Sequence, residues 1–393
     1  MEKALENIKQ LAAEGEGSRQ QLMVALHKLA QSFESTNDTI HRYGHMNLQT
    51  AAVKTGIDLG LFVELVKANV PLTVETISQM IGVDAVLTNR LLRYLAAISA
   101  IDEVDKGQYA ANHVTKNLTE KLAEAGISHY FGTAAPLYQA LPTYLKKSGY
   151  QDPTDELHTA FQDAWNTPQH VFTWFAHNPE ELKAFNDYMA LRREADVSWL
   201  TVYPVKEEAG SLDATRAVFV NIGGGVGHQC AQFKETYPDI PGRVVLQDLP
   251  HSIAKALPTP DVENMVHDFF EPQPIQAAKF YHLRGVLHNH PPHKVQKLLE
   301  NTKSAMTSDS ILLIDEMIFP EMGLSFNAAS IDMTMLGAFA AMERTEAQWR
   351  ETLKRAGLEL VKTYTYNPMS YESVMDVRLP RTKATLRQWP NAQ

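Results

Sequence analysis

The chain has 393 residues, of which 44% are hydrophobic and 21% charged, and this composition is typical of a globular protein. Its formal net charge of −10 disfavours binding to nucleic acid or anionic lipid unless the basic residues gather on one face. The single cysteine excludes an intrachain disulfide and a zinc site built from cysteines. Because no signal-peptide pattern and no run of about 18 apolar residues is present, we expect a soluble, cytoplasmic protein.

The first half of the chain predicts helices followed by a small hairpin. AAVKTGIDLGLFVELV (51–66) has apolar residues at helical spacing, and residues 72–98 predict two more helices around Gly82. AIDEVDKGQYAA (100–111) predicts a hairpin that turns at Lys106 and Gly107. Helices followed by such a hairpin are the outline of a winged helix.

A winged helix has two possible uses, DNA binding or packing against another protein surface. The helix that would read DNA carries Arg90 and Arg93, but the surrounding chain is acidic, whereas specific DNA binders concentrate positive charge. The sequence favours a dimerisation or packing module.

The second half alternates short apolar segments with helical patterns, which indicates a parallel sheet with helical crossovers and therefore an α/β fold. The predicted strands lie in RAVFVNIGGG, GRVVLQDLP, ENMVHDFF, AKFYHLRGVLH and DSILLIDEMI. The segments 358–367 and 371–380 predict a terminal antiparallel hairpin at the sheet edge.

The most specific segment is VFVNIGGGVGHQC (218–230), where a strand enters a glycine-rich turn and then a helix. Its glycines form G-x-G-x-G, and His228 stands where the dinucleotide fingerprint needs glycine or alanine, so a cofactor without a pyrophosphate fits better. Asp248 ends the next strand, where an acid would bind ribose hydroxyls. Asp268 and Phe269 follow one strand later and suit an adenine ring. Together they predict a site for an adenosine-containing ligand.

These segments, together with YHLRGVLHNH, LLIDEMI and MERTEAQW, resemble the fungal class I S-adenosylmethionine-dependent O-methyltransferases, which are related to plant caffeate and flavonoid O-methyltransferases. The family also includes pericyclases similar to the leporin-forming enzyme. The resemblance implies a homodimer with a winged-helix dimerisation domain (1–115), a helical linker region that contributes to the substrate pocket (116–205), and a seven-stranded Rossmann-like catalytic domain (206–393).

The resemblance also implies roles for individual residues. Gly223 and Gly225 would line the methionine part of S-adenosyl-L-methionine, Asp248 would hold its ribose, Asp268 and Phe269 would take the adenine, and Arg284 would lie near the cofactor.

His288 follows an apolar strand, where open α/β sheets place their sites, so by its position it is either a catalytic residue or an ordinary polar loop residue. In the family this position is the general base, and its orienting acids match Glu316 and Glu343. The implied function is methylation of a phenolic or enolic hydroxyl on an aromatic or polyketide-derived secondary metabolite.

The segment YHLRGVLHNHPPH also contains H-x-H-x-x-H, formed by His288, His290 and His293. The alternative to a metal site is a solvated loop before a helix that begins at Pro291 and Pro292. No carboxylate joins the three histidines at ligand spacing, and the family uses no metal here, so we expect no metal site.

An aromatic-rich region between residues 129 and 199 predicts core packing for most of its large side chains. The family builds its acceptor pocket from this region, and the likeliest contributors are His129, Phe185, Met189 and Arg193. The alternative for the arginine is an exposed helix face.

The sequence departs from the family pattern at three positions. Asn221 and Asn289 stand where acids are usual, and Pro292 takes the place of an acid in the loop after the histidine. Asparagine hydrogen-bonds but cannot balance a cation, so both changes could weaken methyl transfer. The alternative function is therefore a cofactor-bound pericyclase, which cyclises a quinone-methide-type polyketide or pyridone intermediate without net methyl transfer.

Overall fold

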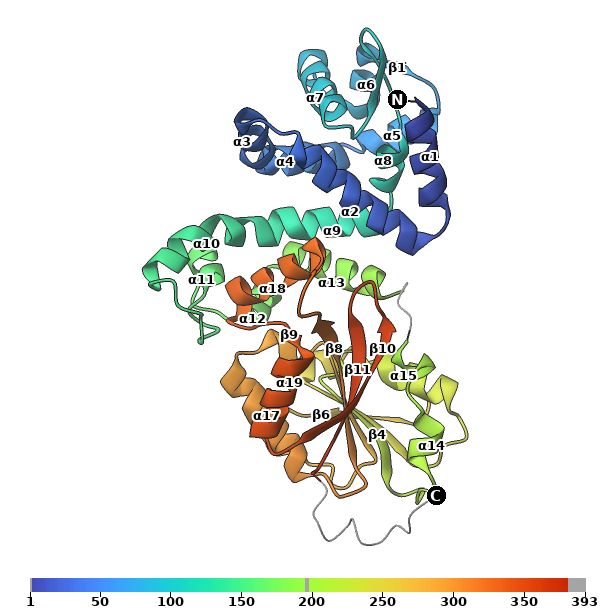
Figure 1. Ribbon diagram of the computed structural model, residues 1–393, viewed down its shortest axis with the longest axis vertical. Coiled ribbons are helices and arrows are strands. Elements are labelled where there is room, and N and C mark those ends of the chain that lie inside the picture. The colour runs from blue at the N-terminus through green and yellow to red at the C-terminus, as the bar shows by residue number, and fades with distance from the viewer. Residues whose placement is uncertain (1, 195–197, 381–393) are drawn as a thin grey trace. The chain divides into compact units, whose positions relative to one another are not determined.

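The computed structural model describes residues 2–194 and 198–380, and Figure 1 shows the course of the chain. It divides into two compact units, which we describe separately. The helical unit comprises Met1–Ala135 and Asn178–Glu194, and the sheet unit comprises Pro136–His177 and Ala195–Gln393. Helices between residues 116 and 205, which we expected to form one region, are thus divided between the two units.

The helical unit contains these elements in chain order: α1 (Glu2–Ala13), α2 (Glu16–Ser32), α3 (Thr36–Gly44), α4 (Met46–Asp58), α5 (Leu61–Ala68), β1 (Leu72–Thr73), α6 (Val74–Ile81), α7 (Ala85–Ala97), β2 (Asp102–Asp105), β3 (Gln108–Ala110), α8 (His113–Asn117), α9 (Lys121–His129), the π-helical turn η1 (Tyr130–Ala134) and α13 (Pro179–Glu194). The helix predicted over residues 51–66 is interrupted between α4 and α5, because Gly60 has a left-handed backbone with φ of 65°.

The predicted winged helix is present. Strand β3 pairs antiparallel with β1 and β2, and Tyr109 of β3 is fully buried against α5, α6 and α7. The strand that forms the wing, β2, reads Asp-Glu-Val-Asp, and all four residues are exposed. An acidic wing would repel a phosphate backbone, which supports the packing module over DNA binding.

The sheet unit is built on a long twisted sheet. Its strands are β4 (Ala217–Ile222), β5 (Arg243–Asp248), β6 (Val262–Val266), β7 (Phe280–Arg284), β8 (Ile311–Phe319), β10 (Glu359–Asn367) and β11 (Glu372–Arg378), and the short β9 (Arg344–Thr345) pairs with β8. The order is β10-β11-β8-β7-β4-β5-β6, and the strands are parallel except for β11, which pairs antiparallel with both β10 and β8. This confirms the predicted α/β fold and the edge hairpin.

Helices cover both faces of this sheet, as Figure 1 shows for α17 and α19 on one side and α14 and α15 on the other. The helices of the unit are α10 (Ala135–Lys147), α11 (Ala160–Trp165), α12 (Val171–His177), η2 (Trp199–Thr201), α14 (Val205–Ala209), α15 (His228–Thr236), α16 (Pro250–Ile253), η3 (Leu287–Asn289), α17 (Pro292–Ser304), α18 (Phe326–Phe339) and α19 (Glu346–Arg355).

Strand β8 shows how the two faces are filled. Leu312 and Ile314 join the core that includes α17 and α19, whereas Ile311 and Leu313 join the core around Trp199. Successive side chains of a strand point to opposite faces, so a strand covered on both sides is apolar throughout. The continuous apolar runs in the sequence have this cause.

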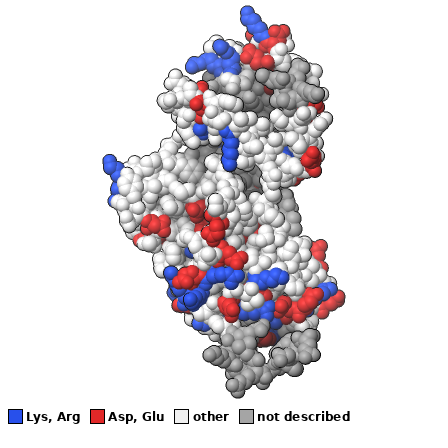
Figure 2. Space-filling model, viewed as in Figure 1, with Lys and Arg blue, Asp and Glu red and all other residues white. Residues whose placement is uncertain are grey.

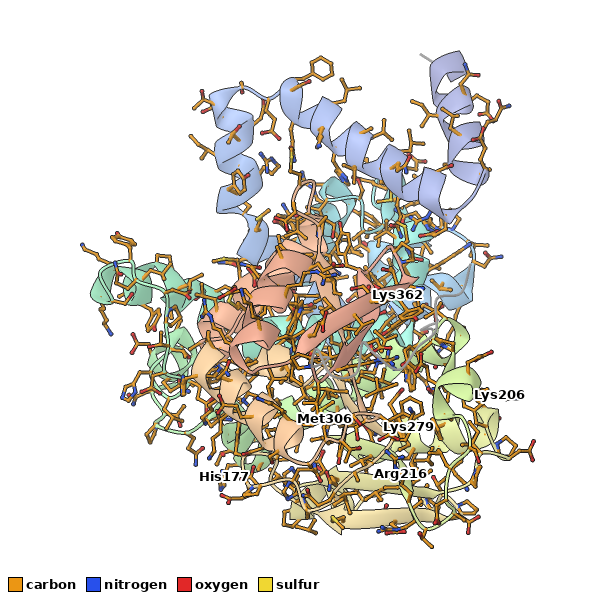
Figure 3. The ribbon with its side chains drawn as sticks, turned by 60° about the horizontal axis from the view of Figure 1, so that its bottom comes forward. His177, Lys206, Arg216, Lys279, Met306 and Lys362 are labelled. Carbon is orange, nitrogen blue, oxygen red and sulfur yellow. The ribbon has the colours of Figure 1, made fainter. Side chains whose placement is uncertain are left out.

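The chain order of the strands reverses beside β4, since β5 and β6 lie on one side of it and β7 and β8 on the other. Open α/β sheets bind ligands at this switch point, at the carboxyl ends of the strands. Arg216 and Lys279, labelled in Figure 3, precede β4 and β7 at the amino ends of the strands. The Asp309 side chain accepts a hydrogen bond from Arg216, and its main-chain carbonyl accepts one from Lys279, so these strand starts are joined.

Charged side chains of both signs are intermingled over the sheet unit on the face that Figure 2 shows. Among the described residues, no helix is both long enough and apolar enough to cross a membrane.

Candidate active site

The glycine-rich turn joins β4 to α15, and three of its glycines have left-handed backbones, with φ of 65° at Gly223, 61° at Gly225 and 96° at Gly227. Gly224 is required for another reason. A Cβ atom there would lie 2.6 Å from Leu246 Cδ1 and would also collide with the amide of Asn221. The turn therefore packs directly on the sheet, and the helix that follows presents its N-terminal N–H groups.

Asp248, at the carboxyl end of β5, is fixed against this turn. Its Oδ2 accepts the Gly225 N–H at 2.7 Å, and its Oδ1 accepts the Leu249 N–H at 2.7 Å. The carboxylate therefore stands beside the glycine turn, as expected of a group that binds ribose hydroxyls.

The Asp268–Phe269 pair follows β6. Asp268 is exposed and accepts the Phe270 N–H at 2.9 Å. A Cβ at Gly223 would lie 3.3 Å from the Phe269 ring and 3.0 Å from Val286 Cγ2, so the turn and the ring lie side by side. These residues form a cradle that fits the adenosine of S-adenosylmethionine and that a side chain at position 223 would fill.

Arg284 ends β7, and Asp315 lies opposite it in the register of β8. Arg284 Nε is 3.3 Å from Asp315 Oδ2, and the Tyr366 hydroxyl donates to Asp315 Oδ1 at 2.7 Å. A buried carboxylate thus holds the arginine at the strand end. Asp315 and Tyr366 were not predicted from the sequence, although Asp315 stands next to Glu316.

His288 lies in η3, the turn after β7, and its Nδ1 is 2.6 Å from Glu343 Oε1. Glu343 is only 4% exposed, and its own N–H donates to Asp332 of α18 at 2.8 Å. A carboxylate on Nδ1 fixes the tautomer of the ring and stabilises its protonated form.

Glu316 binds the main chain of the turn that carries His288. Its Oε1 accepts the main-chain N–H groups of Val286 at 3.1 Å, Leu287 at 2.8 Å and His288 at 3.4 Å. It therefore fixes the turn that carries the histidine. Burial, with a contribution from Glu343, raises the pKa of Glu316 to about 7.

Ligand-type atoms of His288, Glu316 and Glu343 lie within 4.8 Å of one another, and this is the one such group of His, Cys, Asp and Glu among the described residues. Each member already has a protein hydrogen-bond partner. His290 and His293 do not join the group, so the described geometry does not support the H-x-H-x-x-H alternative.

The other histidines of YHLRGVLHNHPPH have structural surroundings. His282 is fully buried in β7, stacked on Trp199 at 4.9 Å, and burial lowers its pKa. His290 is only 8% exposed and meets the ring of Phe270 edge-on at 5.1 Å. It is a buried residue and not part of a solvated loop, while His293 is exposed at the start of α17.

Two of the departures from the family pattern are held by local hydrogen bonds. Asn289 Nδ2 donates to the Gly285 carbonyl at 2.9 Å, a bond that a carboxylate cannot make. Asn221 Oδ1 lies 3.3 Å from His282 Nδ1 in the sheet interior. Pro292 is the first residue of α17, a position where proline fits a helix.

The candidate substrate residues belong to the helical unit. The His129 ring contacts Phe185 at 5.4 Å, Tyr188 at 5.9 Å and Tyr130 at 5.5 Å. Burial lowers the pKa of His129 to about 4, so the ring is neutral near pH 7.

Two further substrate candidates, Met189 and Arg193, belong to α13. Met189 is half-buried on α13, and the side chain of Arg193 lies outside the described residues. Of the expected core aromatics, Trp174, Phe175 and Trp199 are buried, whereas Phe131, Tyr138 and Phe172 are exposed.

Comparison with known proteins agrees with this arrangement. Residues 145–359 match the O-methyltransferase domain, and residues 42–121 match the O-methyltransferase dimerisation domain. The first match covers more than half of the chain. The chain belongs to the O-methyltransferase family that combines these two domains.

Particular relatives are fungal. The chain is 38% identical to O-methyltransferase ucdC of Aspergillus ustus, over 88% of this chain and 90% of the relative. It is 35% identical to demethylsterigmatocystin 6-O-methyltransferase of Aspergillus parasiticus, over 92% and 93% of the two chains.

Two solved structures, each 36% identical to this chain with a TM-score of 0.85, are similarly close. One is described as a pericyclic reaction enzyme and aligns over 96% of this chain and 99% of its own. The other is LepI in complex with S-adenosylmethionine, which aligns over 96% and 98%. The expected family, fold class and cofactor, S-adenosyl-L-methionine, are thereby confirmed, whereas the reaction is not distinguished.

The packing of the glycine turn gives a first prediction. Gly224→Ala should weaken the binding of S-adenosylmethionine and destabilise the fold by about 1–3 kcal/mol, because the new methyl group collides with Leu246 and Asn221. Calorimetric titration and thermal unfolding measure both effects. Gly44→Ala, where a Cβ meets nothing within 4 Å, is the control. Native affinity and stability in Gly224→Ala would contradict this packing.

The raised pKa of Glu316 gives a second prediction. Between pH 4.5 and about 7 the native state keeps a proton that the unfolded chain loses, so stability falls as the pH rises through this window. In Glu316→Gln this fall should shrink, by at most about 3 kcal/mol. Urea unfolding at about pH 5 and about pH 8 measures it, with exposed Glu359→Gln as the control. Equal pH dependence in native protein and Glu316→Gln would mean that Glu316 stays charged.

Proposed function

We propose that this protein is an S-adenosylmethionine-dependent O-methyltransferase that acts on a phenolic or enolic hydroxyl of an aromatic or polyketide-derived secondary metabolite. One observation carries the proposal: His288 stands at the carboxyl end of β7, hydrogen-bonded through Nδ1 to the buried carboxylate of Glu343 at 2.6 Å. A general base needs a histidine whose ring is held in place by an orienting group, and Glu343 provides that group.

In this mechanism His288 accepts the proton of the hydroxyl at Nε2, since Nδ1 is engaged with Glu343. The Glu343 carboxylate stabilises the imidazolium that forms. Glu316 keeps η3 in place, so that the imidazole does not need to be positioned anew in each turnover. When bound, S-adenosylmethionine supplies an electrophilic methyl group on a sulfonium centre.

The cofactor is proposed to lie along the three strand ends described above. Gly223 and Gly225 admit its methionine part close to the backbone, and Asp248, which also accepts the Gly225 N–H, accepts hydrogen bonds from its ribose hydroxyls. Asp268 and Phe269 serve the adenine. Arg284, held by Asp315, completes the set.

For the acceptor, we propose the aromatic group around His129 in the helical unit. A neutral histidine among aromatic rings suits an apolar aromatic molecule with one hydrogen-bonding group. Phe185 and Met189 are four residues apart on α13, so we propose both for this surface. Arg193, eight residues after Phe185, is proposed with them from the family resemblance alone.

A pericyclase is the second candidate. The similarity to a solved pericyclic reaction enzyme supports it, with a TM-score of 0.85. Asn289 supports it as well, because its amide is bonded to the Gly285 carbonyl and adds no negative charge near His288. In that reaction His288 would donate a hydrogen bond and would not remove a proton.

We also propose that the protein is a cytoplasmic homodimer. The family dimerisation domain spans residues 42–121. Just before it, α2 contains no buried residue, yet Leu29 is 53% and Phe33 77% exposed. Helices with apolar side chains and no core of their own need a partner surface, and continuity with the dimerisation domain favours a second copy of the chain.

Replacement of the proposed base gives a third prediction. His288→Ala should lower kcat for methyl transfer by about 10²- to 10⁴-fold and leave the affinity for S-adenosylmethionine close to native. Mass spectrometry would follow both the methylated product and S-adenosylhomocysteine. His293→Ala, an exposed histidine of α17, is the matched control. Full turnover in His288→Ala would exclude the residue as the base, and a product of unchanged mass without S-adenosylhomocysteine would favour the pericyclase.

The exposed helix α2 gives a fourth prediction. The double variant Leu29→Glu, Phe33→Glu should shift the protein from dimer to monomer, because the new carboxylates cannot be buried at an apolar interface. Light scattering after size-exclusion chromatography measures the mass. Val361→Glu, 50% exposed on β10, should leave the mass unchanged. A dimer that survives in the double variant would remove α2 from the interface.

A further inference from the structure

Arg344 is a buried cation that follows Glu343 directly in the chain. It opens β9, which pairs with the end of β8, and it is 2% exposed. Its Nη1 donates to the Met342 carbonyl at 3.1 Å, and its guanidinium lies 5.0 Å from the centre of the Trp349 ring. Its Nη2 is buried without a hydrogen-bond partner in the described chain. Burying such a charge is costly unless nearby charges compensate it.

The compensating charges are the carboxylates of the candidate site. Glu343 directly precedes Arg344. Arg344 is in register with Ile318, two residues after Glu316 on β8, so Arg344 and Glu316 point to the same face of the sheet. Asp332, which accepts the Glu343 N–H, also interacts electrostatically with Arg344. Three carboxyl groups therefore interact electrostatically with this one arginine.

No other charged group described near Glu316, Glu343 and Asp332 could compensate their negative charge in place of Arg344. Asp315 adds negative charge to Glu316 from the opposite face of β8, and Arg284 is engaged with Asp315. The negative charge of the exposed Asp152 helps to raise the pKa of Asp332. Among the described groups that interact with Glu316, Arg344 is the arginine on the same face of β8.

A histidine beside uncompensated carboxylates would keep its proton, because nearby negative charge favours the imidazolium. A general base must instead be neutral before the reaction. The two carboxylates that orient the ring and its turn therefore work against its use as a base. A fixed positive charge near the carboxylates lowers the pKa of the histidine again and does not require a contact with its ring.

We propose that Arg344 is a positioning residue for methyl transfer, which offsets the charge of Glu343, and of Glu316 where it is ionised, so that His288 is neutral, and can accept a proton, near neutral pH. This inference rests on the proposed role of His288 as the base. It assigns Arg344 no contact with substrate or cofactor.

The test compares Arg344→Met, which keeps the length of the side chain and removes its charge, with Arg344→Lys, which keeps the charge. In Arg344→Met the acid limb of the pH profile of kcat/KM should move to higher pH by about one unit, and activity should recover at alkaline pH. Arg344→Lys should restore most of the native profile. Arg350→Met, which removes an exposed arginine of α19, should leave it unchanged.

A second readout separates the proposed charge effect from the proposed reaction. The titration of the His288 ring can be followed by NMR in protein labelled with ¹³C at histidine Cε1, with His288→Gln for assignment. The midpoint should move upward in Arg344→Met and return in Arg344→Lys. A shifted midpoint in a protein that makes no methylated product would refute methyl transfer and retain the charge effect.

An unchanged midpoint and acid limb in Arg344→Met, with activity lowered equally at every pH, would overturn the proposal and leave Arg344 a purely structural role. Should Arg344→Met fail to fold, Asp332→Asn tests the same electrostatics with the opposite sign. It removes one negative charge while its side-chain oxygen can still accept the Glu343 N–H, so the midpoint should move downward. A midpoint that stays in place would overturn the proposal.

Discussion

The hydrogen bonds from the main chain of residues 286–288 to the carboxylate of Glu316 determine the geometry of the candidate site. They fix a short turn on a rigid inner strand, because Glu316 belongs to β8, which is buried on both faces. The ring of His288 then needs a single further contact, its bond to Glu343, to be oriented. Precision at the histidine thus derives from the sheet and less from the loop in which it lies.

The cofactor side has the same character. The Asp248 carboxylate already holds the glycine turn, and Phe269 already lies against Gly223, so both elements are shaped before a ligand arrives. A pre-formed site loses little conformational freedom on binding. A methyltransferase and a pericyclase could share such a cofactor site, so the difference between them must depend on the proton chemistry at His288 and on the acceptor surface.

Much of this could be predicted from the sequence, because the carboxyl ends of parallel strands meet at one edge and the polar residues that follow them are recognisable. Asp248 and Asp268 were predicted in this way, whereas Arg284 was predicted only from the resemblance to the family. What depends on packing could not be predicted. No sequence pattern shows that Glu316 binds the main chain of a turn, that His290 is buried, or that Arg344 interacts electrostatically with three carboxyl groups. These properties arise from contacts between elements far apart in the chain.

Asp315 and Glu316 are consecutive residues of β8, and their side chains leave the strand on opposite faces. The first holds the arginine proposed for the cofactor, and the second holds the turn of the proposed base. The function of each acid therefore depends on which face of the sheet its position in the strand gives it. An insertion or deletion of one residue ahead of this pair would exchange the two acids between the faces and disable both halves of the site at once. The acceptor surface proposed around His129 is on other elements, α9 and α13, so such a change in β8 would leave its residues in place.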